Sequence, residues 1–235
     1  MIHAEWYHNA MNPLDYLQLQ LKLEGKGVID GKFLRRVEVV PDEETPLMMI
    51  AQLADKNLVA YFDETLQTEL LQELTKGLST VSFPRIDALT TTLRARNISF
   101  EMGHYKTYFF PEAYASFKDE EAICYSKRDP KVKEFGFDGF AESVYAIEQD
   151  DKIVSACVST RENNFCGEAW VYTDSKYRNQ GLAQRVVGAW SKNLLSTGKV
   201  PFYSHKIQND ASAILAKRLG LQSVFEEIVI SYTNV

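Results

Sequence analysis

A short glycine-containing loop between a strand-like and a helix-like segment limits the possible folds of this chain more than any other feature. The loop, residues 177–183, has the sequence YRNQGLA. Residues 168–173 before it are typical of a β-strand, and residues 184–190 after it are typical of a helix. The first N–H groups of a helix have no partner inside it, and the helix dipole adds partial positive charge there. The loop therefore predicts an α/β domain with a phosphate-binding site, where Gly181 allows a ligand to approach the backbone closely.

A second segment with a related organisation follows this helix. Residues 199–205 predict a buried strand, and Asn209 and Ser212 precede an apolar helical stretch. Gly220 stands where a left-handed residue is expected after a helix. Residues 174–218, which include both segments, contain eight lysines and arginines and only two acids. This local positive charge suits a ligand with several phosphates.

Both segments resemble motifs of a known family. Arg178, Gly181 and Ala183 form an Arg-x-x-Gly-x-Ala pattern that resembles the pyrophosphate loop of GNAT-superfamily acetyltransferases, which bind acetyl-CoA. Asn209 and Ser212 resemble the second motif of the same family, in which such side chains face the cofactor.

The resemblance covers residues 117–232 and looks closest to the branch with an extra N-terminal domain, which includes the zwittermicin-resistance-type acetyltransferases. It implies an α/β (α+β) GNAT fold, with a central mixed, mostly antiparallel sheet flanked by helices. A smaller α/β domain would precede this fold. We therefore divide the chain into an N-terminal domain, residues 1–113, and a GNAT acetyltransferase domain, residues 114–235. The N-terminal domain is expected to shape the acceptor site or to close over it.

The resemblance also implies how acetyl-CoA would be held as a co-substrate. In this family it lies where two neighbouring strands part, and here these strands would end at Thr173 and Lys206. The implied cofactor-binding residues come from the first strand, the loop and the second motif: Val171, Tyr172, Thr173, Arg178, Asn179, Gln180, Gly181, Leu182, Ala183, Gln184, Asn209 and Ser212.

The proton-transfer groups are the part of the site in which the chain departs from the family. Many members carry a tyrosine that donates a proton to the departing thiolate, and Ala216 occupies the matching position here. Either another group replaces this tyrosine or the thiolate leaves unaided. The substitutes to consider on the predicted adjacent strand are Tyr203, Ser204 and His205, and His205 could serve as an acid or a base because histidine side chains titrate near neutrality. The alternative for His205 is a strand-end histidine bonded to the backbone.

Glu168 is a further candidate catalytic residue, because it matches the frequent general base of the family. It alternates with Trp170 and Tyr172 on one face of the predicted strand, and we expect Trp170 to be in the core. The alternative for Glu168 is an exposed strand residue without a catalytic role.

The remaining elements are predicted from periodicity and from breaker residues. We expect helices at 17–23, 63–77 and 84–97 and strands at 47–51, 58–62, 105–110, 144–148 and 153–159. Residues 17–23 alternate like a strand, but the preceding Asn12-Pro13 favours a helix. Asp63 is expected to cap the second helix and Gly77 to end it.

Composition excludes several other classes of function. The formal net charge of −6 argues against nucleic acid or an anionic membrane as a partner, and no run of about 18 apolar residues predicts a transmembrane helix. The N-terminal sequence does not resemble a signal peptide. The three scattered cysteines fit a reducing, cytoplasmic location, and no histidine and cysteine spacing matches a metal site.

The leading hypothesis is an N-acetyltransferase that transfers an acetyl group from acetyl-CoA to a primary amine of a small molecule. The acidic N-terminal half would attract such a cationic acceptor, and a homodimer is compatible with the sequence. One alternative is a non-catalytic module that binds or senses acyl-CoA, and another is a protein N-acetyltransferase. The sequence leaves the acceptor and the length of the acyl chain open.

Overall fold

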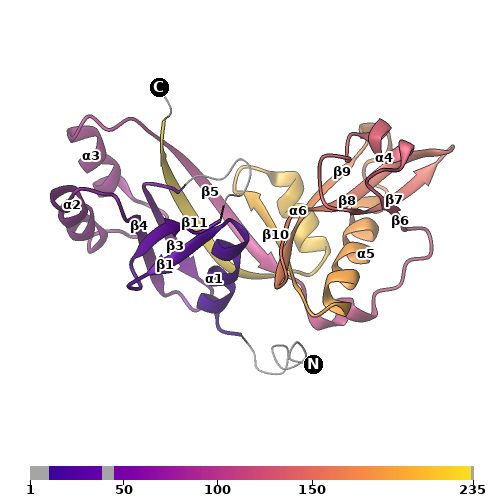
Figure 1. Ribbon diagram of the computed structural model, residues 1–235, viewed down its shortest axis with the longest axis horizontal. Coiled ribbons are helices and arrows are strands. Elements are labelled where there is room, and N and C mark those ends of the chain that lie inside the picture. The colour runs from indigo at the N-terminus through magenta and orange to yellow at the C-terminus, as the bar shows by residue number, and fades with distance from the viewer. Residues whose placement is uncertain (1–10, 39–44, 234–235) are drawn as a thin grey trace. The chain divides into compact units, whose positions relative to one another are not determined.

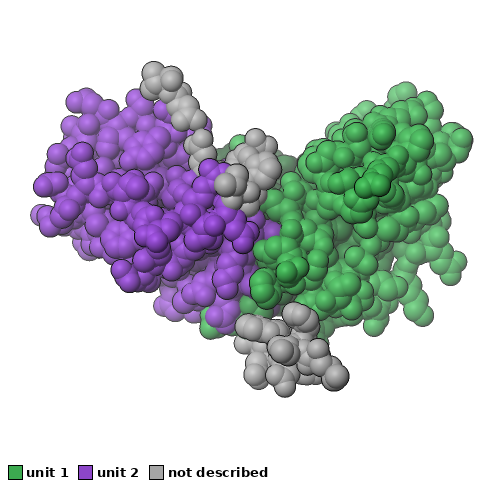
Figure 2. Space-filling model, in the orientation of Figure 1, with its two compact units in different colours: residues 1–12, 107–224 green, residues 13–106, 225–235 purple. Residues whose placement is uncertain are grey.

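The computed structural model of the protein describes residues 11–38 and 45–233. These residues form two compact units, shown in separate colours in Figure 2. Unit 1 contains residues 11–12 and 107–224, and unit 2 contains residues 13–106 and 225–233. The sequence-based division between residues 113 and 114 lies within a 3₁₀ turn, η1 (Glu112–Ser116), in unit 1. The domain roles assigned to that division remain a prediction.

Two strands pass through the divisions between the units, namely β5 (Phe100–Phe109) and β11 (Gln222–Tyr232). The other elements of unit 1 are β6 (Ile123–Ser126), α4 (Pro130–Phe135), β7 (Ser143–Gln149), β8 (Lys152–Glu162), β9 (Cys166–Thr173), η2 (Ser175–Tyr177), α5 (Leu182–Ser196), β10 (Val200–Lys206) and α6 (Asp210–Arg218). The strands follow the order β10-β9-β8-β7-β6, in which β9 and β10 are parallel and the other neighbours antiparallel. This confirms an α/β fold with a mixed, mostly antiparallel sheet.

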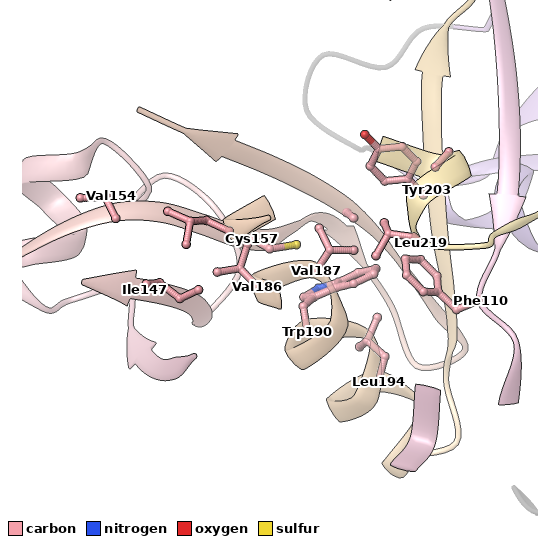
Figure 3. Close-up of a cluster of buried hydrophobic side chains, with 13 residues drawn as sticks. Phe110, Ile147, Val154, Cys157, Val186, Val187, Trp190, Leu194, Tyr203 and Leu219 are labelled. Atoms are coloured by element: carbon pink, nitrogen blue, oxygen red, sulfur yellow. The ribbon is translucent and has the colours of Figure 1, made fainter. Parts of the chain in front are cut away.

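Helices cover both faces of the sheet of unit 1, and Figure 1 shows α5 and α4 on opposite sides of β7, β8 and β9. The core on the α5 face contains Val186, Trp190 and Leu194, which recur at helical spacing along α5 and pack against inward-facing strand residues (Figure 3). The core on the α4 face contains Val132 and Phe137, which pack against the alternate residues of β7 and β8. The sheet therefore has two buried faces, and neighbouring residues of β9 face different surroundings.

Unit 2 contains α1 (Pro13–Leu23), β1 (Lys26–Ile29), β2 (Phe33–Arg36), β3 (Met48–Leu53), β4 (Leu58–Asp63), α2 (Thr68–Leu78) and α3 (Asp87–Ala95). Its strands follow the order β1-β2-β4-β3-β11, with β2 and β4 parallel and the other pairs antiparallel. The predicted helix after Pro13, the hairpin of β3 and β4, and the hairpin of β7 and β8 are confirmed. Asp150 and Asp151 make the latter turn with positive φ angles of 50° and 64°, which short polar residues tolerate.

Other sequence predictions are corrected by the structure. Asp63 does not cap α2, because its carboxylate accepts hydrogen bonds from the backbone and hydroxyl of Thr65 and forms a turn before the helix. Gly77 lies inside α2, where a Cβ would come within 2.9 Å of the Leu89 side chain. Trp170 is 40 % exposed rather than in the core, although its ring stacks on Phe137.

Some elements were not predicted at all, among them β1, β2, β6 and α4. Three of these are strands of four residues, too short for periodicity to identify. The short helix α4 did carry a local signal, because Asp129 accepts a hydrogen bond from the Lys131 N–H and Pro130 occupies the first turn. In the part of the chain that the structure describes, no helix is long and apolar enough to cross a membrane.

Candidate active site

The predicted phosphate loop joins the end of β9 to the start of α5. Asn179 and Gly181 both adopt left-handed backbone conformations, with φ angles of 63° and 79°, and Gly181 is the residue that precedes the helix. The first hydrogen bond of α5 runs from the Arg185 N–H to the Gly181 carbonyl, at 3.3 Å. The N–H groups of residues 182–184 therefore have no carbonyl partner within the helix and are placed to bind an anion.

The side chains of the loop leave its surface open. A Cβ at Gly181 would meet only the Gln184 Oε1 atom, at 3.7 Å, so glycine is required here by the positive φ angle and not by crowding. Arg178 Nε donates to the Thr173 carbonyl at 3.2 Å, and its guanidinium lies 5.8 Å from the centre of the Tyr172 ring. Arg178 thus ties the loop to the end of β9 while its remaining N–H groups stay exposed.

β9 and β10 are the two strands expected to flank the cofactor, and they separate partway along their length. The parallel ladder of β9 and β10 joins three residue pairs and ends where Glu168 pairs with Phe202. Both strands continue beyond this pair, to Thr173 and to Lys206. Backbone groups of Val171 and Thr173 consequently lie on the side of β9 from which β10 has departed, and can bind an extended ligand there.

The second motif folds as predicted, and its asparagine has a structural partner. Asn209 Oδ1 accepts a hydrogen bond from the Ser212 N–H at 3.1 Å and so caps α6. The Ser212 side chain lies close enough to the Tyr203 hydroxyl of β10 to affect its pKa. The structure thereby brings the start of α6 next to the parted end of β10.

Tyr203 is almost fully buried, and its ring belongs to the core on the α5 face. Burial raises the pKa of Tyr203 to about 12, and the neighbouring Ser212 side chain opposes this shift. In Figure 3 the Tyr203 hydroxyl points away from the apolar cluster. A hydroxyl that stays protonated at neutral pH, with its ring fixed, can act as a proton donor.

Ala216 of α6 is buried in the core on the α5 face, next to the Leu219 and Leu215 side chains. The tyrosine found in many family members therefore has no counterpart at this position of α6. The Tyr203 hydroxyl of β10 lies near the start of α6, at Ser212.

His205 is held by two hydrogen bonds. Its Nδ1–H donates to the Lys206 carbonyl at 2.9 Å, which leaves Nε2 to accept a 3.3 Å hydrogen bond from the Tyr108 hydroxyl. The Tyr108 and His205 rings stack with centroids 5.5 Å apart. This geometry fits the alternative of a strand-end histidine bonded to the backbone, and a proton-transfer role for His205 remains a prediction.

Glu168 is buried rather than exposed, which overturns the alternative of an exposed strand residue. Its carboxylate accepts hydrogen bonds from the Arg161 guanidinium, with Nε at 3.0 Å and Nη2 in closer contact. An irregularity in the pairing of β8 and β9, between Ser159 and Arg161, brings Arg161 opposite Glu168. If Glu168 acts as a base, its carboxylate must do so while it is bound to Arg161. This role also remains a prediction.

Arg161 and Tyr108 are therefore the site residues that are not among those predicted from the sequence. Neither lies in a motif. Tyr108 contacts His205 because strands distant in the chain lie together, whereas Arg161 contacts Glu168 because the pairing of the consecutive strands β8 and β9 is irregular between Ser159 and Arg161. In the described residues no group of three or more histidines, cysteines, aspartates and glutamates could hold a metal ion. Among the described residues no cysteine forms a disulfide, and burial raises the pKa of the Cys157 thiol, so this thiol is a packing group.

The chain is similar in sequence and in fold to known N-acetyltransferases. The uncharacterized N-acetyltransferase YdfB of Bacillus subtilis (strain 168) is 32% identical over 95 residues, which are 40% of this chain and 35% of YdfB. The chain thus matches about a third of that relative's length. An acetyltransferase from the GNAT family from Colwellia psychrerythraea superposes with a TM-score of 0.48 at 13% identity, covering 95% of this chain and 98% of that one.

A tandem GNAT protein from the clavulanic acid biosynthesis pathway superposes with a TM-score of 0.49 at 8% identity, covering 96% of this chain and 98% of that one. These two structural likenesses are too distant to carry an argument about substrate. The match to the family model described as GNAT acetyltransferase is much broader, because it spans residues 32–229 and so includes most of both units. The chain belongs to the GNAT acetyltransferase family.

Proposed function

We propose that the protein transfers an acetyl group from acetyl-CoA to a primary amine of a small molecule. The observation that carries this proposal is the parting of β9 and β10 after Glu168 and Phe202, with the open N–H groups of the 178–184 loop at the end of β9. One end of this arrangement suits a pyrophosphate and the other suits an extended arm that leads to a thioester. Family membership supports acyl transfer as the reaction.

In the proposed reaction the amine nitrogen attacks the thioester carbonyl, the carbon–sulfur bond breaks, and the thiolate takes up a proton while the new amide loses one. Tyr203 is the proton donor to the thiolate, because its hydroxyl is protonated at neutral pH and lies beside Ser212. Glu168, held by Arg161, receives the amine proton through water. Holding both substrates in one geometry supplies much of the rate acceleration.

The proposal includes the finer assignments of family branch, location and acceptor. We place the protein in the branch with an additional N-terminal domain, which includes zwittermicin-resistance-type acetyltransferases, and assign residues 1–113 to recognition of the acceptor. The match to YdfB, a bacterial N-acetyltransferase, supports an amine acceptor. The three cysteines, none of which forms a disulfide, support a cytoplasmic location.

The proposal is tested by acetyl-CoA calorimetry on the wild type and on Gly181→Glu. The substitution places a carboxylate where the pyrophosphate should lie, and we expect it to weaken binding about 100-fold or more. Gly136→Glu is the matched control, because Gly136 has a φ angle of 83°, open surroundings and a position outside the loop. Equal binding by wild type and Gly181→Glu, or none by either, would reject the cofactor site.

A non-catalytic acyl-CoA-binding function is the second candidate. The observations that favour it are the engagement of Glu168 by Arg161 and of His205 by the Lys206 carbonyl, together with Ala216 in place of a tyrosine. Amine-dependent release of free CoA thiol separates the two functions. Binding of acetyl-CoA without release by any member of an amine library would support the binding module, whereas release with peptide amines alone would support a protein N-acetyltransferase.

A further inference from the structure

An exposed aromatic surface, formed by Trp170 and Tyr172, lies on the α4 face of β9. Both residues are an even number of positions from Glu168, so the three side chains share one face of the strand. Val158, the residue opposite Trp170 on β8, belongs to the core on the α4 face, which identifies that face. Trp170 and Tyr172 are 40 % and 44 % exposed. Two large aromatic side chains are thus accessible on the same side of β9 as the predicted general base.

Two phenylalanines hold the Trp170 ring from the same side. Phe137 stacks on it with centroids 4.5 Å apart and an interplanar angle of 22°, and the Phe140 centroid is 4.4 Å away. The Phe137 and Phe140 centroids are 5.9 Å apart, whereas rings on opposite faces of one indole would be separated by about twice the stacking distance. Among the described residues, this leaves the opposite face of the indole open to a ligand. The orientation of that face is fixed, because Phe137 is itself only 2 % exposed.

Tyr172 is already engaged at the phosphate loop. The Arg178 guanidinium lies 5.8 Å from the centre of its ring, and the Phe135 ring packs against it with centroids 5.7 Å apart. Because β9 runs towards the loop, Tyr172 is also farther from Glu168 than Trp170 is. Trp170 is therefore the aromatic side chain that adjoins both Glu168 and the point where β10 separates from β9.

Strand geometry determines the distance between the Trp170 ring and the predicted base. Side chains two positions apart on one face of a strand are about 7 Å apart. A planar ring stacked on Trp170 would consequently bring an amine to Glu168 through a linker of about two or three carbons. Phe202, the residue opposite Glu168 on β10, is fully buried and offers no comparable stacking surface.

We propose that the acceptor is a primary amine joined to an aromatic ring by a short carbon linker, and that Trp170 selects this ring by stacking. The inference rests on the proposed acetyl transfer and adds the chemical class of the acceptor. Stacking on a ring that is already held in place favours a planar aromatic group over an equally apolar puckered one, because aromatic pairs attract beyond the area that they bury. The acetyl group passes to the amine nitrogen as in the proposed reaction, with free CoA thiol as the second product.

The test compares 2-phenylethylamine with 2-cyclohexylethylamine, which differ in the planarity of one ring. Release of free CoA thiol by the full chain gives kcat/KM for each amine, and comparing the ratio of the two values between variants cancels the intrinsic reactivity of the amines. We expect Trp170→Leu to lower this ratio about threefold or more and Trp170→Phe to retain most of it. Phe165→Leu is the matched control and should leave the ratio unchanged, because it removes an aromatic side chain that is 50 % exposed in the turn between β8 and β9.

A measurement on the wild type does not depend on how Trp170→Leu folds. The chain has three tryptophans, and the indole N–H signal of Trp170 in NMR is the one that is missing in Trp170→Phe. In the presence of CoA, saturation with 2-phenylethylamine should shift this signal, because a stacked aromatic ring adds a ring current. Saturation with 2-cyclohexylethylamine should shift it much less. Equal shifts with both amines, or none with either, would overturn the inference.

The outcomes of the kinetic test separate this inference from the proposed function. If no amine, butylamine included, releases thiol with the wild type, the proposed function fails and the inference is rejected with it. If the wild type releases thiol but Trp170→Leu lowers the ratio by less than about threefold, the inference alone is rejected. Equal losses for both amines in Trp170→Leu give this second result, since Trp170 would then contact the ammonium group or only support the fold.

Discussion

The two ends of the proposed active site are built in different ways. At the cofactor end, the loop from Arg178 to Gln184 presents backbone N–H groups, and the conformation of Gly181 is its main requirement. At the reaction end, each candidate group depends on a side chain from another strand. Glu168 is bound by Arg161, and His205 is bound by Tyr108. Local sequence determines a backbone site, whereas a side-chain site depends on how the strands pair and, for His205 and Tyr108, on strands that are distant in the chain.

The largest effect expected to distinguish the reaction end from the cofactor end is a loss of stability on substitution of Arg161. Replacing it by methionine leaves the buried Glu168 carboxylate without its cation, which should lower the free energy of unfolding by about 3 kcal/mol. The double variant Arg161→Met with Glu168→Leu should recover most of this loss, since buried ion pairs and apolar pairs are often equally stable. Urea unfolding of the three proteins measures both. If Arg161→Met were as stable as the wild type, the Arg161–Glu168 ion pair would not stabilise the reaction end.

Removal of the Tyr203 hydroxyl should act on the reaction and not on the cofactor. Tyr203→Phe keeps the buried ring, and we expect kcat to fall about 10-fold to 100-fold with an unchanged acetyl-CoA Kd. Because the pKa of Tyr203 is raised to about 12, its donor function should persist through neutral and mildly alkaline pH. Tyr108→Phe is the matched control, as it removes the hydroxyl that donates to His205. A larger loss of kcat in Tyr108→Phe would transfer the donor role to the Tyr108–His205 pair.

This division also explains what could be predicted from the sequence. The strand, loop and helix around Gly181 were identifiable, because left-handed glycine and helix N-terminal N–H groups are local properties. The helix α6 after Asn209 was identifiable for the same reason, because its asparagine cap is a local property. The burial of Glu168 was not, because it follows from pairing irregularities between Ser159 and Arg161 that have no local signal. The exposure of Trp170 likewise depends on how far Phe137 and Phe140, from a distant segment, cover that face of β9.

At the cofactor end a smaller effect is expected from Gly181→Ala. A left-handed conformation costs a non-glycine residue roughly 1–2 kcal/mol, and that strain should appear in the free energy of unfolding. The added Cβ meets only Gln184 Oε1 at 3.7 Å, so acetyl-CoA affinity should stay within about threefold of the wild type. Gly136→Ala should cost a similar amount of stability, since it has a φ angle of 83° and open surroundings. Loss of acetyl-CoA binding in Gly181→Ala alone would show that space, and not backbone conformation, defines the loop.

The smallest expected effect concerns a side-chain anchor at the cofactor end. Arg185, in the second turn of α5, binds the Asp119 carboxylate with Nε at 2.6 Å and Nη2 at 2.9 Å. The hydrogen bond from Arg185 lowers the pKa of Asp119 below its usual 3.8, with help from the Ala122 and Glu121 N–H groups and against the effect of burial. A lowered folded-state pKa stabilises the fold above the unfolded pKa, and this contribution is lost as the pH falls through the folded value.

Asp119→Asn should therefore lower the free energy of unfolding at pH 7 by about 1 kcal/mol or less, because Arg185 is partly exposed to solvent. The difference from the wild type should begin to shrink as the pH falls below about 4, the pKa of the unfolded state, and should be lost as the pH falls through the lowered folded-state pKa, where the folded wild-type carboxyl also becomes neutral. Glu121→Gln is the control, since Glu121 binds the same guanidinium from an exposed position and should contribute less. Acetyl-CoA affinity should be unchanged in both variants, because the loop binds through backbone groups that neither substitution touches. A tenfold or greater loss of affinity in Asp119→Asn would show instead that the cofactor end, like the reaction end, depends on side chains brought together by the fold.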